Sequence, residues 1–172
     1  MPLTDEHLTE YLAGTNIGTI ACFTGHRPQK LTRPADEVRA DLETEISKAI
    51  SDGYTTFISG MAAGVDLWAA RIVLCQREKN HDLTLIAAVP FPGFLGSRKS
   101  EDDAEYDSIL AAADFVIDLF PSYRSDAFQK RNEWMVDHSS RVIVVYNGQA
   151  SGTRNTIRYA EKKNTDIIYL KG

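Results

Sequence analysis

Cysteine is scarce in this chain, because only Cys22 and Cys75 occur among 172 residues, far apart and without a C-x-x-C spacing. That count excludes a disulfide-rich secreted scaffold, and the spacing excludes a cysteine-based zinc site. The four histidines show no metal-ligand spacing either, so we expect no metal site. Both cysteines lie in apolar runs, which indicates buried free thiols in a reducing cytoplasm.

Long apolar runs and an excess of positive charge are also missing. Pro and Gly interrupt the apolar stretch IAAVPFPGFLG well short of a bilayer crossing, and the N-terminal stretch MPLTDEHLTEYLAG is acidic and not leader-like. The formal net charge is −5 and the sequence pI is about 5.4. We therefore expect a cytoplasmic protein with no membrane segment. Without a local basic patch, nucleic acid is not expected as its partner.

Complete catalytic motifs are absent as well. The chain has no G-x-S-x-G elbow, no H-E-x-x-H, no Walker-type G-K-[ST] and no G-x-G-x-x-G fingerprint. These absences remove the standard signatures of α/β-hydrolases, zinc proteases, P-loop NTPases and dinucleotide-binding dehydrogenases. Whether the protein is an enzyme is left open by the sequence.

Six short runs typical of strands alternate with helical patterns: NIGTIACF, YTTFIS, LTLIAAVPF, DFVIDLF, RVIVVY and DIIYL. The alternation predicts one α/β domain over residues 1–172, with a largely parallel sheet of about six strands and helices on both faces. Apolar residues four apart in RPADEVRADLETEISKAISDG predict a crossover helix. Further helices are expected over about 64–78, 101–113, 128–139 and 151–163. A short helix over 5–13 forms an N-terminal extension, residues 1–16.

The stretch SGMAAGVDLWAA lies at a predicted strand-to-helix turn and contains two glycines, Gly60 and Gly64. Glycines there allow positive φ and close approach of a ligand, while the first helical turn offers unpaired amides and a dipole that favours an anion. A packing role is equally open, with Gly60 turning the chain and Gly64 lying against the sheet. The candidate phosphate contacts of this loop are Ser59, Gly60, Met61, Ala62, Gly64 and Val65.

Two other loops follow strands and should reach the same carboxyl edge of the sheet, where open α/β sheets bind ligands. The stretch NGQASGTRNTIRYA places glycines and hydroxyls at a helix start, and FTGHRP adds an imidazole and a guanidinium. Ser151 could equally be an ordinary N-cap, and His26 a structural hydrogen-bond partner. The candidate residues here are Thr24, Gly25, His26, Arg27, Gly148, Ser151, Gly152 and Thr153.

Three further groups have polar side chains near this edge. Arg131 and Asn132 begin a helix and could close over a ligand, although a solvated helix start requires no such role. Asp66 could act as a general base or accept from a ribose hydroxyl, or only complement the helix dipole. Weaker candidates are Asp103, Tyr106 and Tyr123.

In this order, FTGHRP, SGMAAGVDLWAA, AVPFPGF, QKRNEWMVDHSSRVIVVYNG and SGTRNTIRYA resemble the SLOG superfamily, most closely its YpsA-like branch of small bacterial and phage proteins. The resemblance runs from about Ile17 to Leu170. It implies a Rossmann-like sheet that binds nucleotides or nucleotide-derived ligands without requiring a cofactor. Distant members include the DNA-processing protein DprA and the LOG phosphoribohydrolases. Members commonly associate with themselves, so a homo-oligomer is also implied.

By this resemblance, Gly60 to Gly64 corresponds to the first ligand loop and Gly152-Thr153 to the phosphate loop, while Arg131 lies near an arginine that LOG enzymes use. LOG enzymes have a P-G-G-x-G-T-x-x-E pattern whose glutamate serves in cleavage of the N-glycosidic bond. Thr156 stands at that position here. A threonine cannot act as a carboxylate base, so phosphate binding can persist without that hydrolysis.

The leading hypothesis is a domain that binds a nucleotide or nucleotide-derived ligand through two glycine-containing loops, and one form of this hypothesis is a sensor of that ligand. A second hypothesis is hydrolysis of the N-glycosidic bond of a nucleotide or NAD-like molecule, with Asp66 as the catalytic carboxylate. The third, DprA-like binding of single-stranded DNA, is weakened by the negative net charge. The sequence does not distinguish a substrate from a signal, nor name the base.

Overall fold

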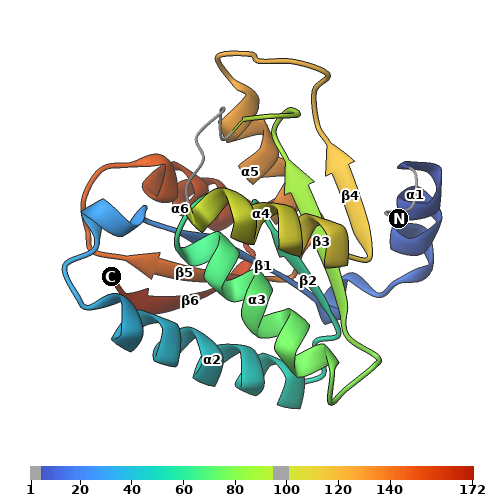
Figure 1. The fold of residues 1–172 in the computed structure, drawn as a ribbon, viewed down its shortest axis with the longest axis horizontal. Helices are drawn as coiled ribbons and strands as arrows, with labels where there is room; N and C mark the ends of the chain where they lie inside the picture. The colour runs from blue at the N-terminus through green and yellow to red at the C-terminus, as the bar shows by residue number, and fades with distance from the viewer. Residues whose placement is uncertain (1–4, 95–100) are drawn as a thin grey trace.

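The computed structural model of the chain describes residues 5–94 and 101–172, and its elements alternate as expected for an α/β protein (Figure 1). The α-helices are α1 Asp5–Gly14, α2 Ala35–Ser51, α3 Val65–Arg77, α4 Glu101–Ala112, α5 Ala127–Asp137 and α6 Gly152–Lys162. The strands are β1 Ile20–Gly25, β2 Thr56–Ser59, β3 Thr84–Val89, β4 Phe115–Asp118, β5 Arg141–Tyr146 and β6 Asp166–Lys171. Two 3-10 turns, η1 Ile17–Thr19 and η2 Pro28–Lys30, flank β1.

The strands form one six-stranded sheet in the order β4-β3-β2-β1-β5-β6, and every neighbouring pair is parallel. From β1 the chain moves outward through β2, β3 and β4, then returns to place β5 on the other side of β1. The order of the strands therefore reverses between β1 and β5, which is the switch point at which open α/β sheets bind ligands. The predicted Rossmann-like α/β fold is confirmed.

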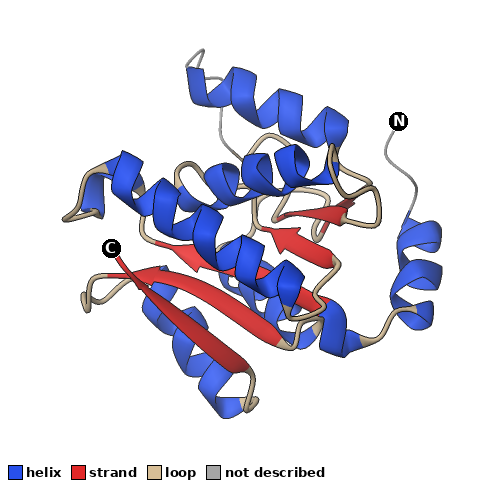
Figure 2. Ribbon diagram, turned by 90° about the horizontal axis from the view of Figure 1, so that it is seen from below, coloured by secondary structure: helices blue, strands red, loops and turns tan. Residues whose placement is uncertain are grey.

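Helices cover both faces of the sheet (Figure 2). Side chains alternate along each strand, so that Phe23 and Phe57 enter the layer under α2, α3 and α4, whereas Cys22 and Ile58 face α1, α5 and α6. Because β1, β2, β3 and β5 are largely buried on both faces, their near-continuous apolar runs in the sequence follow directly. Among the described helices, none combines the length and apolarity that a bilayer crossing needs.

Three local expectations were wrong. The first strand begins at Ile20 and not at Asn16, because the Asn16 side chain accepts from the Gly18 amide and starts a 3-10 turn. Thr24 and Gly25 belong to β1 and not to the following loop, since they pair with Val144 and Val145 of β5. Cys75 is exposed on α3, and only Cys22 is buried, with burial raising its thiol pKa to about 12.

Candidate functional site

A cavity of about 210 Å³ opens at the carboxyl edge of the sheet, beside the switch point between β1 and β5. Four parts of the chain meet there: the end of β1 with its loop, the turn between β2 and α3 with the start of α3, the start of α5, and the start of α6. Its lining residues are Thr24, Gly25, His26, Arg27, Lys30, Ala62, Asp66, Phe128, Arg131, Asn132, Ser151, Gly152 and Thr153. Three permanent cations against one carboxyl make the wall positive although the whole chain is negative.

His26 is the least expected group in this wall, because it is only 2 % exposed. Its ring stacks on Tyr146 with centroids 5.2 Å apart, and neither ring nitrogen has a hydrogen-bond partner within ordinary distance among the described residues. Burial lowers the pKa of His26, and the nearby Asn147 side chain opposes that shift only in part. A buried imidazole whose nitrogens lack a hydrogen bond of ordinary geometry costs free energy, and an acceptor in the cavity would recover part of that cost.

The start of α6 contributes backbone amides to the same cavity. Ser151 is the N-cap, and its Oγ accepts from the Arg154 amide at 3.4 Å, which leaves the amides of Gly152 and Thr153 without intrahelical acceptors. A Cβ added to Gly152 would meet no atom within 4 Å. No acidic residue lies in the first turn of α6, so its positive dipole end is uncompensated by side chains of that turn.

Arg131 and Asp66 form the buried floor of the cavity. The Arg131 guanidinium donates to the Gly60 carbonyl and, through Nε, to Asn132 Oδ1 at 2.8 Å. Burial raises the pKa of Asp66 and lowers the pKa of Arg131, while the attraction between the two opposes both shifts. Both side chains are therefore held in a weakly solvated environment in which an anion would interact strongly with the guanidinium.

The loop between Gly60 and Gly64 forms hydrogen bonds with adjacent residues and packs against the loop that follows β1. Ser59 Oγ accepts from the Met61 amide at 3.2 Å, and Asp66 Oδ2 accepts from the Ala62 amide at 3.2 Å, so two amides expected to face a phosphate are already bonded. Gly64 has a φ of 89°, and a Cβ there would lie 2.6 Å from Pro28 Cδ. Gly64 is thus needed for packing against the first loop.

Gly60 is confined in the same way. A Cβ on it would lie 2.8 Å from the Arg131 guanidinium carbon and 2.9 Å from Asp66 Oδ2. The glycine gives these two charged side chains room to meet the loop backbone. The loop therefore places Asp66 and Arg131, and its own backbone is a support for the cavity wall.

Of the predicted site residues, the cavity brings together Thr24, Gly25, His26, Arg27, Ala62, Asp66, Arg131, Asn132, Ser151, Gly152 and Thr153. The predicted residues outside its lining are Ser59, Gly60, Met61, Gly64, Val65 and Gly148, together with the weaker candidates Asp103, Tyr106 and Tyr123. Lys30 and Phe128 line the cavity and were not predicted. Lys30 lies four residues beyond His26 in the same loop, whereas nothing in the sequence pattern singled out Phe128.

Thr156 is buried within α6, and its hydroxyl donates to the Gly152 carbonyl at 3.0 Å. It does not line the cavity. The position that corresponds to the LOG glutamate therefore carries a side chain bonded within its own helix. Among the described residues, no three His, Cys, Asp or Glu side chains converge in a way that could hold a metal ion.

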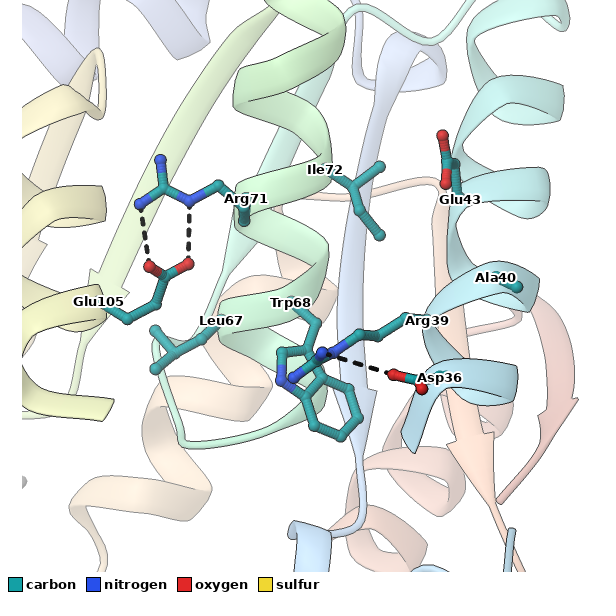
Figure 3. A pocket seen from close by; sticks show the side chains of 9 residues that line it. All are labelled: Asp36, Arg39, Ala40, Glu43, Leu67, Trp68, Arg71, Ile72 and Glu105. Carbon is teal, nitrogen blue, oxygen red and sulfur yellow. Dashed lines mark hydrogen bonds and ion pairs between the residues drawn. The ribbon is translucent and has the colours of Figure 1, made fainter. Parts of the chain in front are cut away.

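A larger cavity of about 570 Å³ lies between α2, α3 and α4 and shares no lining residue with the first. Figure 3 shows each of its two arginines beside a partner, with Arg71 Nε 2.9 Å from Glu105 Oε1 and the Arg39 guanidinium over the ring of Trp68. Asp36 completes this arrangement, 3.8 Å from Arg39. Because these cations already have partners, we place the functional site in the smaller cavity.

The fold and the site together define a doubly wound α/β domain with a cationic cavity at its switch point. Residues 21–171 match the YspA SLOG family, and the chain belongs to that family. It is 33 % identical over 139 residues to the uncharacterized SPbeta prophage-derived protein YoqJ of Bacillus subtilis, covering 74 % of this chain and 80 % of that protein. It is 27 % identical over 156 residues to a UPF0398 protein of Bacillus thuringiensis, covering 86 % and 85 %.

Two solved structures share the fold at 19 % sequence identity. DNA processing protein A (DprA) from Helicobacter pylori, whose single-stranded DNA binding mode has been described, superposes with a TM-score of 0.66 over 94 % of this chain and 68 % of that one. DprA from Streptococcus pneumoniae gives a TM-score of 0.62 over 90 % of this chain. The chain spans about half the length, 51 %, of that second protein. At this identity the likeness is one of fold.

Proposed function

We propose that the protein binds a phosphorylated nucleoside or a derivative of one, with a phosphate in the cavity at the start of α6. The phosphate accepts from the amides of Gly152 and Thr153, and Arg27 and Lys30 neutralise it from the first loop. The proposal narrows the sequence hypothesis from two phosphate loops to one, since the loop from Gly60 to Gly64 places Arg131 and has its Met61 and Ala62 amides already bonded.

The observation that carries the proposal is the buried, unpartnered imidazole of His26 in the same wall as the α6 N-terminus. A helix N-terminus alone is too common to indicate a ligand site, and cations in a loop alone can simply be exposed to solvent. A polar ring that is shielded from solvent and lies beside uncompensated amides and cations would be stabilised by an acceptor in the cavity. Membership of the SLOG family supports a nucleotide as the source of that acceptor.

A melting-temperature screen tests this proposal. Ribose 5-phosphate, the nucleoside mono-, di- and triphosphates, ADP-ribose and NAD are compared with the unphosphorylated nucleosides. A ligand at 100 times its dissociation constant adds about 2.7 kcal/mol to the free energy of unfolding. For a domain of this size, this corresponds to a rise in melting temperature of roughly 5–10 °C. We expect such a rise only with phosphorylated members of the panel.

Two variants locate the binding, with a third as control. Gly152→Asp has room for its side chain and places a carboxylate at a helix start, so the fold should be kept while a phosphate is repelled. Arg27→Ala removes an exposed cation of the cavity. Arg39→Ala removes an exposed cation of the other cavity and should leave the ligand effect unchanged. An undiminished ligand shift in Gly152→Asp and Arg27→Ala would exclude this site.

Asp66 gives a reason to consider cleavage of the N-glycosidic bond as a second function. Its carboxyl lines the cavity, and its raised pKa is a property of groups that act as general acids near neutral pH. Release of free base from each ligand that stabilises the protein is measured by chromatography. If base is released at the same rate by Asp66→Asn, this mechanism is wrong.

Binding of single-stranded DNA is a third candidate, favoured by the fold likeness to H. pylori DprA and by the cations around the cavity. The negative net charge opposes it over the rest of the surface. Retention of an oligonucleotide that falls steeply with salt and is lost in Arg27→Ala would support it. Absence of retention at low salt would remove it.

A further inference from the structure

Five aromatic side chains gather beside the cavity although they come from separate parts of the sequence. Phe91 and Phe94 follow β3, Tyr123 follows β4, Phe128 lies in α5, and Tyr106 lies in α4. Phe91 contacts Tyr123, Phe128 and Phe94 edge to face, with centroids 5.6, 5.8 and 6.3 Å apart. Phe94 in turn contacts Tyr106 and Phe128 at 5.7 and 6.0 Å.

This aromatic cluster joins the cavity to the surface. At one end Phe128 is part of the cavity lining. At the other end Tyr123 is 67 % exposed, more than the other exposed large hydrophobic side chains of the described residues, Ile17 and Tyr169. Phe91 lies between them and contacts both. Tyr123 therefore presents a planar apolar surface that is separated from the lining residue Phe128 by the ring of Phe91.

The chemistry of the two neighbouring surfaces fits the two ends of one ligand. Amides and cations at the start of α6 suit a phosphate, whereas aromatic rings suit a planar base, which stacks irrespective of its identity. Since Phe128 belongs both to the cavity lining and to the aromatic cluster, the two surfaces are continuous. That continuity favours a nucleotide base over a separate protein partner as the occupant.

We infer that Tyr123 stacks on the base of a nucleotide whose phosphate lies at the start of α6, with Phe91 and Phe128 connecting its ring to the cavity. The inference rests on the proposed function and adds to it that the base, and not only the phosphate, is recognised. The nucleotide can be free or can be one unit of a single strand, because both present the same base, sugar and phosphate.

The experiment compares a ligand that has a base with one that lacks it. Dissociation constants of the full chain are measured by calorimetry for ribose 5-phosphate, for the four ribonucleoside 5′-monophosphates and for a ten-nucleotide DNA strand. Stacking of a base on an aromatic side chain should make the monophosphates bind roughly 5- to 150-fold more tightly than ribose 5-phosphate. Tyr123→Ala should remove most of this advantage without changing the affinity for ribose 5-phosphate.

Two variants separate stacking from other effects of the substitution. Tyr123→Phe keeps the ring and should keep the advantage of the base. Tyr169→Ala removes the other exposed tyrosine, on β6 and outside the aromatic cluster, and should change nothing. Because Tyr123 is mostly exposed, its truncation should leave the melting temperature of the free protein nearly unchanged.

Each outcome bears on a different claim. If ribose 5-phosphate binds as tightly as the monophosphates, or if Tyr123→Ala keeps the difference, the stacking surface is wrong while the phosphate site stands. If no phosphorylated probe binds, the proposed function fails and the stacking surface fails with it. If the DNA strand binds more tightly than every monophosphate and loses affinity in Tyr123→Ala, the stacking surface is supported and its nucleotide belongs to a strand.

Discussion

Gly64 has a φ of 89° and lies close to Pro28. A side chain at this position would therefore cause both backbone strain and a steric clash. Gly53 has a similar φ of 100°, but a Cβ there would meet no atom within 4 Å. We predict that Gly53→Ala lowers the free energy of unfolding by about 1 kcal/mol through backbone strain alone, and Gly64→Ala by about 2–4 kcal/mol. Urea denaturation measures both. Equal losses would show that Pro28 yields to the added methyl group.

His26 predicts how the affinity for an anion depends on pH. Its folded-state pKa is lowered, so the neutral ring is favoured, and that contribution to stability is lost as pH falls from 6.5 through the folded pKa. A bound anion stabilises the imidazolium, so binding takes up a proton and strengthens by up to about tenfold per pH unit within that window. Sulfate, which does not titrate there, is the probe.

The affinity for sulfate is measured between pH 7.5 and 5.5 by the rise in melting temperature. His26→Gln keeps a polar side chain of similar length and cannot charge, so its sulfate affinity should depend much less on pH. The same pH dependence in both proteins would mean that His26 does not face the bound anion.

At the scale of elements, α1 is an integral part of the core and more than an appended helix. It lies beside the edge strand β4 (Figure 1), where Tyr11 packs on Phe115 with centroids 4.8 Å apart and its hydroxyl lies 2.6 Å from Thr56 Oγ1. Leu8 is only 2 % exposed. These contacts reach across β3 to β2, so the helix ties together one half of the sheet.

Leu8→Ala should therefore lower the free energy of unfolding by about 2–4 kcal/mol. Ile17→Ala, at a side chain that is 51 % exposed in the next turn, should change it by less than about 0.5 kcal/mol. Neither residue lines the cavity, so the ligand-induced rise in melting temperature should survive both substitutions. A small effect of Leu8→Ala in denaturation would indicate that α1 is held only loosely.

The spacing of apolar residues predicted the helices and strands well, because secondary structure depends mainly on neighbours in sequence. It did not predict the roles of residues that depend on contacts with distant parts of the chain. The strand RVIVVY coincides with β5, and the apolar residues four apart in RPADEVRADLETEISKAISDG lie on the buried face of α2. The role of Gly64 depends on Pro28 and that of Gly60 on Arg131, contacts that no local pattern encodes. Phe128 was missed for the same reason, because its neighbours in space come from other loops.

For the whole molecule, the two core layers share one sheet, and this predicts cooperative unfolding. Phe23 on one face and Cys22 on the other are consecutive in β1, so neither layer can open while the other stays intact. We expect one calorimetric transition whose van 't Hoff and calorimetric enthalpies agree within about 10 %. Two resolved transitions would contradict the prediction that residues 1–172 form a single domain.

The pairing of β1 with β5 also has a consequence for folding during synthesis, because β5 is synthesised long after β1. At about 5–20 residues per second, the ribosome adds the residues between these strands over a time on the order of ten seconds. During that time the central strand has one unpaired edge, and the cavity lacks the start of α6. A phosphate bound at the start of α6, as proposed, therefore could not assist early folding, and a chain that stops before Thr153 would lack part of its site. Occupancy of the site would report on finished molecules alone.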